Sequence, residues 1–105
     1  MYDDRLQARL PLSPGQIPAF CRKWQIVELA FFGSVLRDDF RPDSDVDILA
    51  TFAPDAPVSL WDWGPMMEEL RAILGREVDL VEKSAIRNPF RRRAILGNHR
   101  VVYAA

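Results

Sequence analysis

The sequence contains little of what disulfides, zinc sites and membrane spans require. Cys21 is the only cysteine and His99 the only histidine among 105 residues, which excludes an internal disulfide and a zinc site made of these residue types. The longest uncharged apolar stretches, such as Leu29 to Leu36, are far shorter than the roughly 20 residues of a membrane span. The N-terminus is charged where a signal peptide would be apolar. We therefore expect a cytoplasmic protein in which Cys21 and His99 have structural roles.

An excess of charge of one sign is also missing. Lysine and arginine number 14, and aspartate and glutamate number 15, so the formal net charge at pH 7 is -1. This balance gives no general attraction to phosphates, and nucleic acid is not an expected partner. Basic residues nevertheless gather near the C-terminal end, at Arg87, Arg91, Arg92, Arg93 and Arg100. We interpret this group first as a solvated helix face, and second as a contact for an acidic partner or a nucleotide acceptor.

Composition and hydrophobic pattern together predict one mixed domain over residues 1–105. Apolar residues make up 49% and charged residues 28% of the chain, as in globular domains. Strands are predicted over 26–32, 45–52, 77–81 and 101–103. Helices are predicted over 13–23, 34–37, 59–75 and 84–96, the last one beginning near Pro89 and ending at Gly97. Their alternation predicts an α/β (α+β) fold, with a small mixed sheet of about four strands and helices packed on it.

Capping signals define where two of these helices are expected to begin. Ser13 and Gln16 have the spacing of a capping box, with Pro14 at the first helical position. Ser59 has the same relation to an acidic residue three positions later and is expected to cap the third helix. Gly64-Pro65 either bends this third helix or delays its start.

Two aspartates in the middle of the chain form the most informative pattern. Asp45 and Asp47 lie two residues apart in a predicted strand, so both carboxylates project to one face. Like charges so close repel unless a cation is shared between them, and oxygen ligands of this kind select Mg²⁺ or Mn²⁺. Asp79 adds a third carboxylate inside an apolar strand, where an unpaired charge is costly. Glu77 lies on the same face as Asp79 and is the alternative third ligand.

A Gly-Ser pair, separated from the aspartates by ten intervening residues, is the candidate phosphate site. Gly33 follows a predicted strand, where glycine lets the backbone turn close to a ligand. The helix that begins there presents free N–H groups, and Ser34 adds a hydroxyl donor. A phosphate site beside paired metal ions is typical of phosphoryl or nucleotidyl transfer.

The combination of Phe32-Gly33-Ser34, Asp45-Val46-Asp47 and a later Asp79 resembles the nucleotidyltransferase superfamily that includes DNA polymerase β. The stretches GSVLRDDFRPDSDVDILATF and LGREVDLV are similar to the minimal nucleotidyltransferases, which are about as long as this chain. The resemblance implies the nucleotidyltransferase fold and a Mg²⁺-dependent enzyme that uses two ions and takes its nucleotide from ATP.

The same resemblance implies particular residue functions and a partner. Asp45 and Asp47 would bind both metal ions, and Asp79 would bind the catalytic ion and help to deprotonate the acceptor. Gly33 and Ser34 would hold the β- and γ-phosphates, with Arg37 as a further phosphate contact.

Minimal nucleotidyltransferases commonly act as antitoxins of a small helical HEPN-type toxin, by capping it and by adding AMP to it. The resemblance implies the same partner for this chain. The family often has Arg-Gly after the short helix, whereas this chain has Arg37-Asp38. The alternative function is a non-catalytic antitoxin that neutralises its helical partner by binding alone.

Large apolar side chains near residue 60 predict a partner surface. Trp61 and Trp63 point in nearly opposite directions on a helix, so one of them is expected to be exposed. Met66 and Met67 are expected to widen this apolar surface beside the proline-containing loop at 54–57.

Overall fold

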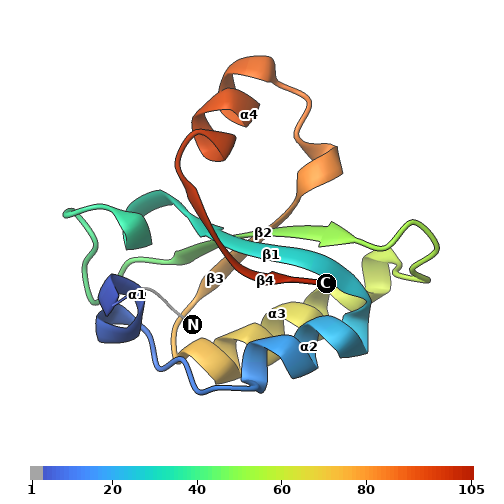
Figure 1. Cartoon of the computed structure of the whole chain (residues 1–105), viewed down its shortest axis with the longest axis horizontal. Coiled ribbons are helices and arrows are strands. Elements are labelled where there is room, and N and C mark those ends of the chain that lie inside the picture. The colour runs from blue at the N-terminus through green and yellow to red at the C-terminus, as the bar shows by residue number, and fades with distance from the viewer. Residues whose placement is uncertain (1–3) are drawn as a thin grey trace.

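A mixed sheet organises the chain, in a computed structural model that describes residues 4–105. Within these residues the sheet has four strands in the order β3-β2-β1-β4 (Figure 1). Their bounds are Ile26–Phe32 for β1, Val46–Phe52 for β2, Val78–Glu82 for β3 and His99–Ala104 for β4. β1 is antiparallel to β2 and to β4, whereas β3 is parallel to β2. The predicted mixed α+β architecture is confirmed.

Helices cover the two faces of the sheet unequally. The α-helices are α1 (Asp4–Arg9), α2 (Gln16–Trp24), α3 (Trp63–Leu74) and α4 (Pro89–Leu96). Short 3-10 turns are η1 (Gly33–Leu36), η2 (Leu60–Asp62) and η3 (Lys83–Ala85). Figure 1 shows α2 and α3 side by side along one face, called here the lower face, and α4 beyond the other, the upper face. None of the helices within residues 4–105 has the length and apolar character needed to cross a bilayer.

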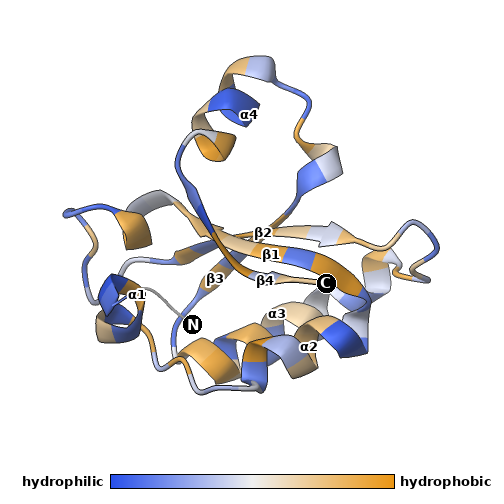
Figure 2. Ribbon diagram, viewed as in Figure 1, coloured by the Kyte–Doolittle hydropathy of each residue, from blue (hydrophilic) through white to orange (hydrophobic). Residues whose placement is uncertain are grey.

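Strand alternation divides the apolar residues between these faces. Leu29, Phe31 and Ile48 belong to the large core that α2 and α3 complete on the lower face. Ala30, Phe32 and Leu49 point the other way, into a smaller cluster closed by Ile86 and by Ile95 of α4. Figure 2 shows hydrophobic and hydrophilic residues mixed along α2 and α3, and the buried ones, such as Phe20 and Leu70, belong to this large core. Most of the burial therefore lies below the sheet, and the upper face is left partly free for polar side chains.

The predicted start of the first long helix is wrong. Helix α2 begins at Gln16, and its N-cap is Gly15 in a left-handed conformation (φ 92°) with no side-chain cap. Pro18 explains the later start: a helix beginning at Pro14 would need an N–H at residue 18 to continue its hydrogen bonds, and proline has none. Beginning at Gln16 places Pro18 in the first turn, where no donor is required.

Other helix starts follow the sequence more closely. The Ser59–Asp62 capping box is present, but it caps the turn η2, and α3 then starts at Trp63 with Gly64-Pro65 in its first turn. The delayed start is therefore the correct alternative for Gly64-Pro65. Helix α4 begins at Pro89, as predicted, with Asn88 Oδ1 accepting hydrogen bonds from two backbone N–H groups.

Candidate active site

Pairing of β2 with β3 brings two of the predicted acidic residues together. Asp47 is opposite Asp79 in this parallel pair, and neighbouring strands lie about 4.8 Å apart. Asp47 lies two positions before Leu49, and Asp79 lies two positions before Val81. Leu49 and Val81 belong to the upper cluster, and residues two apart on a strand share a face, so both carboxylates project from the upper face. Asp45 immediately precedes β2, two positions before Asp47. The structure thus places Asp47 and Asp79 together on the upper face, with Asp45 near enough for its charge to affect Asp47.

The environment of Asp47 raises its pKa above the ordinary aspartate value. Burial is the largest cause, and the negative charges of Asp79 and Asp45 add to it. The positive charges of Arg37 and Arg91 oppose the shift without cancelling it. A half-buried carboxylate surrounded by others is costly for the folded protein, and such groups concentrate at functional sites.

Asp45, Asp47 and Asp79 are called here the acidic group, and Gly33 lies beside its central member, Asp47. Its backbone has φ 76°, a conformation that L side chains rarely adopt. A Cβ atom at this position would lie 2.1 Å from Oδ2 of Asp47, far inside van der Waals contact. Only glycine leaves room for the Asp47 carboxylate, and the turn η1 with Ser34 starts directly beside it. The sequence-predicted phosphate turn and acidic pair are therefore in contact.

Two arginines approach the acidic group, and sequence reasoning identified one of them. Arg37, the predicted phosphate contact, donates from Nε to Oδ1 of Asp39 at 3.1 Å. This hydrogen bond lowers the pKa of the Asp39 carboxyl. Arg91 is in α4, and its charge reaches Asp47 from above the sheet. Its signal in the sequence was Pro89, which starts a helix just after the strand of Asp79 and so brings the arginines of that helix over the same face.

The third carboxylate has two candidates in the sequence, and their contacts differ. Glu77 Oε1 accepts a hydrogen bond at 3.0 Å from Nε of Arg71 in α3. Asp79 faces Asp47 across the strand pair and raises its pKa. The geometry therefore favours Asp79 over Glu77 as the partner of Asp47.

Carboxylate oxygens from adjacent strands are the donors that Mg²⁺ prefers, so the residue types at this edge fit that ion. Within residues 4–105, however, no three side chains of aspartate, glutamate, histidine or cysteine come close enough to form a ready-made metal site. The mutual effect of the three aspartates on the pKa of Asp47 is electrostatic and does not require direct contact. Metal binding by Asp45, Asp47 and Asp79 stays a prediction.

Cys21 and His99 have the contacts of structural residues. Burial raises the pKa of the Cys21 thiol to about 12, so the thiolate needed for reactivity is absent at neutral pH. His99 begins β4 opposite Phe32, with Nδ1 2.9 Å from the carbonyl oxygen of Leu96.

The apolar surface predicted near residue 60 is present, but some of the residues that form it differ from those predicted. Leu60 and Trp61 are 86% and 89% exposed. Met66 is fully buried, so the prediction that it widens the surface is wrong: it lies on the inner side of α3, in the large core. Trp63 is half-buried, with its ring 5.9 Å from that of Phe52.

A groove of about 720 Å³ runs beside Leu60. Its lining residues come from the loop after β2, from the start of α3 and from the end of β3. The end of β2 that lines the groove lies five residues of strand from Asp47, about 17 Å along β2. On the β3 side the groove reaches Leu80, the residue after Asp79, so it extends along β3 toward the acidic group.

Known proteins resemble both the sequence and the fold. Residues 15–102 match a family model described as "Nucleotidyltransferase domain". The protein adenylyltransferase MntA of Thermococcus cleftensis is 41% identical over 66 residues, which are 63% of this chain and 65% of that protein. MJ1379 of Methanocaldococcus jannaschii is 34% identical over 73 residues, 70% of this chain and 73% of its own length.

Solved structures show the same fold at lower identity. A toxin–antitoxin crystal structure with AMP-PNP has a TM-score of 0.70 at 18% identity and covers 90% of this chain and 75% of its own. A complex of a tri-AMPylated HEPN toxin with an MNT antitoxin from Shewanella oneidensis has a TM-score of 0.61 at 17% identity, covering 86% of this chain and 68% of that one. With the family model matching nearly the whole sequence, this chain belongs to the nucleotidyltransferase domain family, beside the small protein adenylyltransferases.

Proposed function

We propose that this protein transfers AMP from ATP to a hydroxyl group of a small helical HEPN-type toxin and thereby acts as its antitoxin. The observation that carries the proposal is the contact of Gly33 with Asp47, which is itself opposite Asp79. Nucleotidyl transfer needs a phosphate-binding turn beside a pair of carboxylates, which are here Asp47 and Asp79. The names of the relatives and of the solved toxin–antitoxin complexes support the same reaction and the same class of partner.

The triphosphate would lie along η1. The backbone N–H groups at the start of this turn would bind phosphate oxygens, and the hydroxyl group of half-buried Ser34 would add a donor. Arg37 and Arg91 lie close enough to oppose the negative charge around Asp47, and they would also oppose the charge of the phosphates. Holding the β- and γ-phosphates here directs the α-phosphorus toward the aspartates.

Asp45, Asp47 and Asp79 would hold two Mg²⁺ ions, which neutralise phosphate charge and activate the acceptor oxygen when bound. In the transfer, the acceptor oxygen forms a bond to the α-phosphorus while the bond from that phosphorus to the pyrophosphate oxygen breaks. The acceptor proton moves to a carboxylate, for which exposed Asp79 is the best-placed group. The bulk of the acceptor protein would exclude water from the reaction.

A tyrosine hydroxyl of the partner is the proposed acceptor. Attack requires the phenol oxygen within about 3.5 Å of the α-phosphorus, in line with the leaving pyrophosphate, which only a docked partner supplies reliably. Leu60 and Trp61 offer an exposed apolar contact for that docking.

Intact-mass measurement of a co-expressed partner tests the proposal. We expect AMP to be added to the partner in the presence of ATP and Mg²⁺, and no addition with Asp47→Asn. A partner that binds stably and gains no mass from the wild-type protein would overturn the transferase function and leave neutralisation by capping as the function.

A further inference from the structure

The loop between the phosphate turn and Asp45 is held by side chains from distant parts of the chain. Residues 37–45 contain no regular helix or strand, and they join the end of the phosphate turn to Asp45, whereas Asp47 is held opposite Phe32 by the pairing of β1 with β2. A loop of this kind must satisfy its backbone carbonyl groups through other parts of the molecule or through water. Here arginines from two distant segments take several of them.

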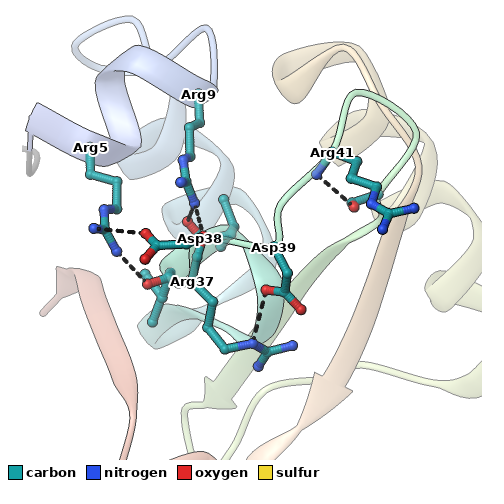
Figure 3. Close-up of polar contacts among 9 residues, drawn as sticks. Arg5, Arg9, Arg37, Asp38, Asp39 and Arg41 are labelled. Atoms are coloured by element: carbon teal, nitrogen blue, oxygen red, sulfur yellow. Dashed lines mark hydrogen bonds and ion pairs between the residues drawn. The ribbon is translucent and has the colours of Figure 1, made fainter.

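Arg9, the last residue of α1, anchors the beginning of the loop. Its Nη1 donates hydrogen bonds to the carbonyl oxygen of Val35, at 2.9 Å, and to that of Arg37. Arg5, one helical turn earlier, donates to the carbonyl oxygen of Leu36 at 2.7 Å. Figure 3 shows both side chains reaching from α1 to the end of the phosphate turn. The end of η1 is therefore attached to α1.

Arg76 anchors the other end of the loop. Its Nη1 donates to the carbonyl oxygens of Arg41, at 3.1 Å, and Ser44, at 2.9 Å. The hydroxyl of Ser44 closes the same turn by accepting from the Arg41 N–H at 2.9 Å (Figure 3). Ser44 directly precedes Asp45, and Arg76 is three residues before Asp79. One guanidinium group thus joins the segments that lead into both acidic strands.

Phe40 connects these two anchors. The guanidinium carbon of Arg76 lies 4.5 Å from the centre of the Phe40 ring, and that of Arg9 lies 5.3 Å from it. The ring also packs against the large core, so it is fixed from below as well. Arginine suits this position because a planar guanidinium can stack on a ring and donate hydrogen bonds at its edge, which lysine does less well.

We propose that Arg9, Phe40 and Arg76, called here the loop clamp, are positioning residues that hold the end of the phosphate turn and Asp45 in place beside the paired strands of Asp47. This inference rests on the proposed nucleotidyl transfer and adds to it the residues that align its two halves. The loop clamp does not touch Asp47 or Gly33 in any described contact, so it would act through the backbone at 35–44. Misplacement of reacting groups by about 1 Å can cost about 100-fold in rate, which makes such a device valuable.

Steady-state kinetics of AMP transfer to the partner separates positioning from folding. We expect Phe40→Leu and Arg76→Lys each to lower kcat by about tenfold or more, with KM for ATP changed by less than about threefold. Arg22→Lys is the control for Arg76→Lys, because Arg22 is exposed on α2 and has none of these contacts. Thermal melting of each variant shows whether the protein remains folded at the assay temperature.

The effects of the clamp residues should also depend on one another. Because Arg76 stacks on Phe40 and both hold the same loop, the double variant Phe40→Leu with Arg76→Lys should lose less kcat than the product of the two single losses. Additive losses, an unchanged kcat in a folded Phe40→Leu variant, or an equal loss for Arg22→Lys would overturn the proposal.

Amide NMR spectra test the clamp without any acceptor. Release of the loop should shift the resonances of Gly33, Ser34, Asp45 and Asp47 in Phe40→Leu, although residue 40 is five or more positions from each. If the wild-type protein transferred no AMP, the proposed function would fail, and unshifted amides at these positions would then overturn the clamp independently.

Discussion

Neighbouring residues of β2 that point to opposite faces of the sheet have opposite effects on the stability of the fold. Ile48 and Ala50 point to the lower face and are completely buried under α2 and α3. Asp47 lies one position away on the same strand and points to the upper face, where its neighbours are other carboxylates. Burying a side chain such as that of Ile48 stabilises the fold by about 1.5–3 kcal/mol, whereas placing aspartates close together destabilises it.

This contrast indicates which face was shaped by function. A carboxylate whose pKa is raised by burial and by like charges weakens the folded state at neutral pH, so stability alone gives no reason for Asp47 and Asp79 to be opposite each other. A shared cation would remove that penalty and supply the reason. The lower face stabilises the sheet on which the upper face presents this arrangement.

The largest expected effect comes from removing the central charge of the upper face. Asp47→Asn keeps the shape of the side chain but removes a proposed metal ligand, so transfer of labelled AMP from ATP should fall by orders of magnitude. Asp4→Asn, which changes an exposed aspartate at the start of α1, is the control and should leave the rate unchanged. Transfer at the wild-type rate by Asp47→Asn would show that the acidic group is not the catalytic site.

Comparison of Asp79 with Glu77 decides which carboxylate is the third ligand. Asp79→Asn should lower the transfer rate nearly as far as Asp47→Asn, since the two residues face each other. Glu77→Gln should retain the rate and lose only the exposed ion pair with Arg71, which contributes about 0–1 kcal/mol to stability. The measurement is the transfer rate of both variants, and the reverse ranking would assign the ligand to Glu77.

Gly33 tests the contact between the phosphate turn and the acidic group. A side chain here would displace the Asp47 carboxylate, so Gly33→Ala should weaken ATP binding and Gly33→Val should weaken it further. Ser34→Ala loses only one hydroxyl, about 0.5–3 kcal/mol, and should weaken binding much less than Gly33→Val. Calorimetric titration with Mg²⁺ present measures all three. The phosphate assignment fails if a folded Gly33→Val binds ATP as tightly as the wild type.

The strands and the acidic positions could be predicted because their signals are local. Alternation in 45–52 fixes which residues share a face, and Gly33 marks where β1 must end. The register that puts Asp79 opposite Asp47, and not opposite Asp45, comes from the pairing of two segments about thirty residues apart. No local pattern contains that information, so the sequence favoured Asp79 but left Glu77 as the alternative.

Features that depend on tertiary contacts were not predicted from the sequence or were predicted wrongly. The six residues of α1 are too few to show helical periodicity, so neither that helix nor its arginines were recognised as part of the site's support. Met66 was expected to widen the apolar surface, but it lies one turn before Leu70 on the buried side of α3. The strand β4 is longer than the predicted 101–103 because its pairing with β1 extends to His99.

A moderate effect is expected at the exposed apolar contact on the far end of the sheet. Trp61→Ser should weaken binding of the HEPN-type partner by about tenfold or more, since a central tryptophan often contributes over 2 kcal/mol to an interface. Its melting temperature should not change, because the side chain is 89% exposed. Phe90→Ser is the control: Phe90 is also exposed, at 81%, but lies on α4 away from the groove. Unchanged affinity of the Trp61→Ser variant would place the interface elsewhere.

The smallest expected effect is on stability, and it has the opposite sign to the effect on activity. The folded-state pKa of Asp47 is raised, so its protonated form favours folding and its ionised form costs stability once the pH exceeds that raised value. Without metal at pH 7, Asp47→Asn should therefore melt a few degrees above the wild type. The difference should shrink as the pH falls through the raised pKa and vanish below about 4, the ordinary aspartate pKa, where Asp47 is protonated in both states. Thermal melting in EDTA across this range measures it, and Mg²⁺ should stabilise the wild type more than the variant. An Asp47→Asn protein that melts below the wild type at pH 7 would mean that the carboxylate stabilises the fold, and the contrast between the two faces would be lost.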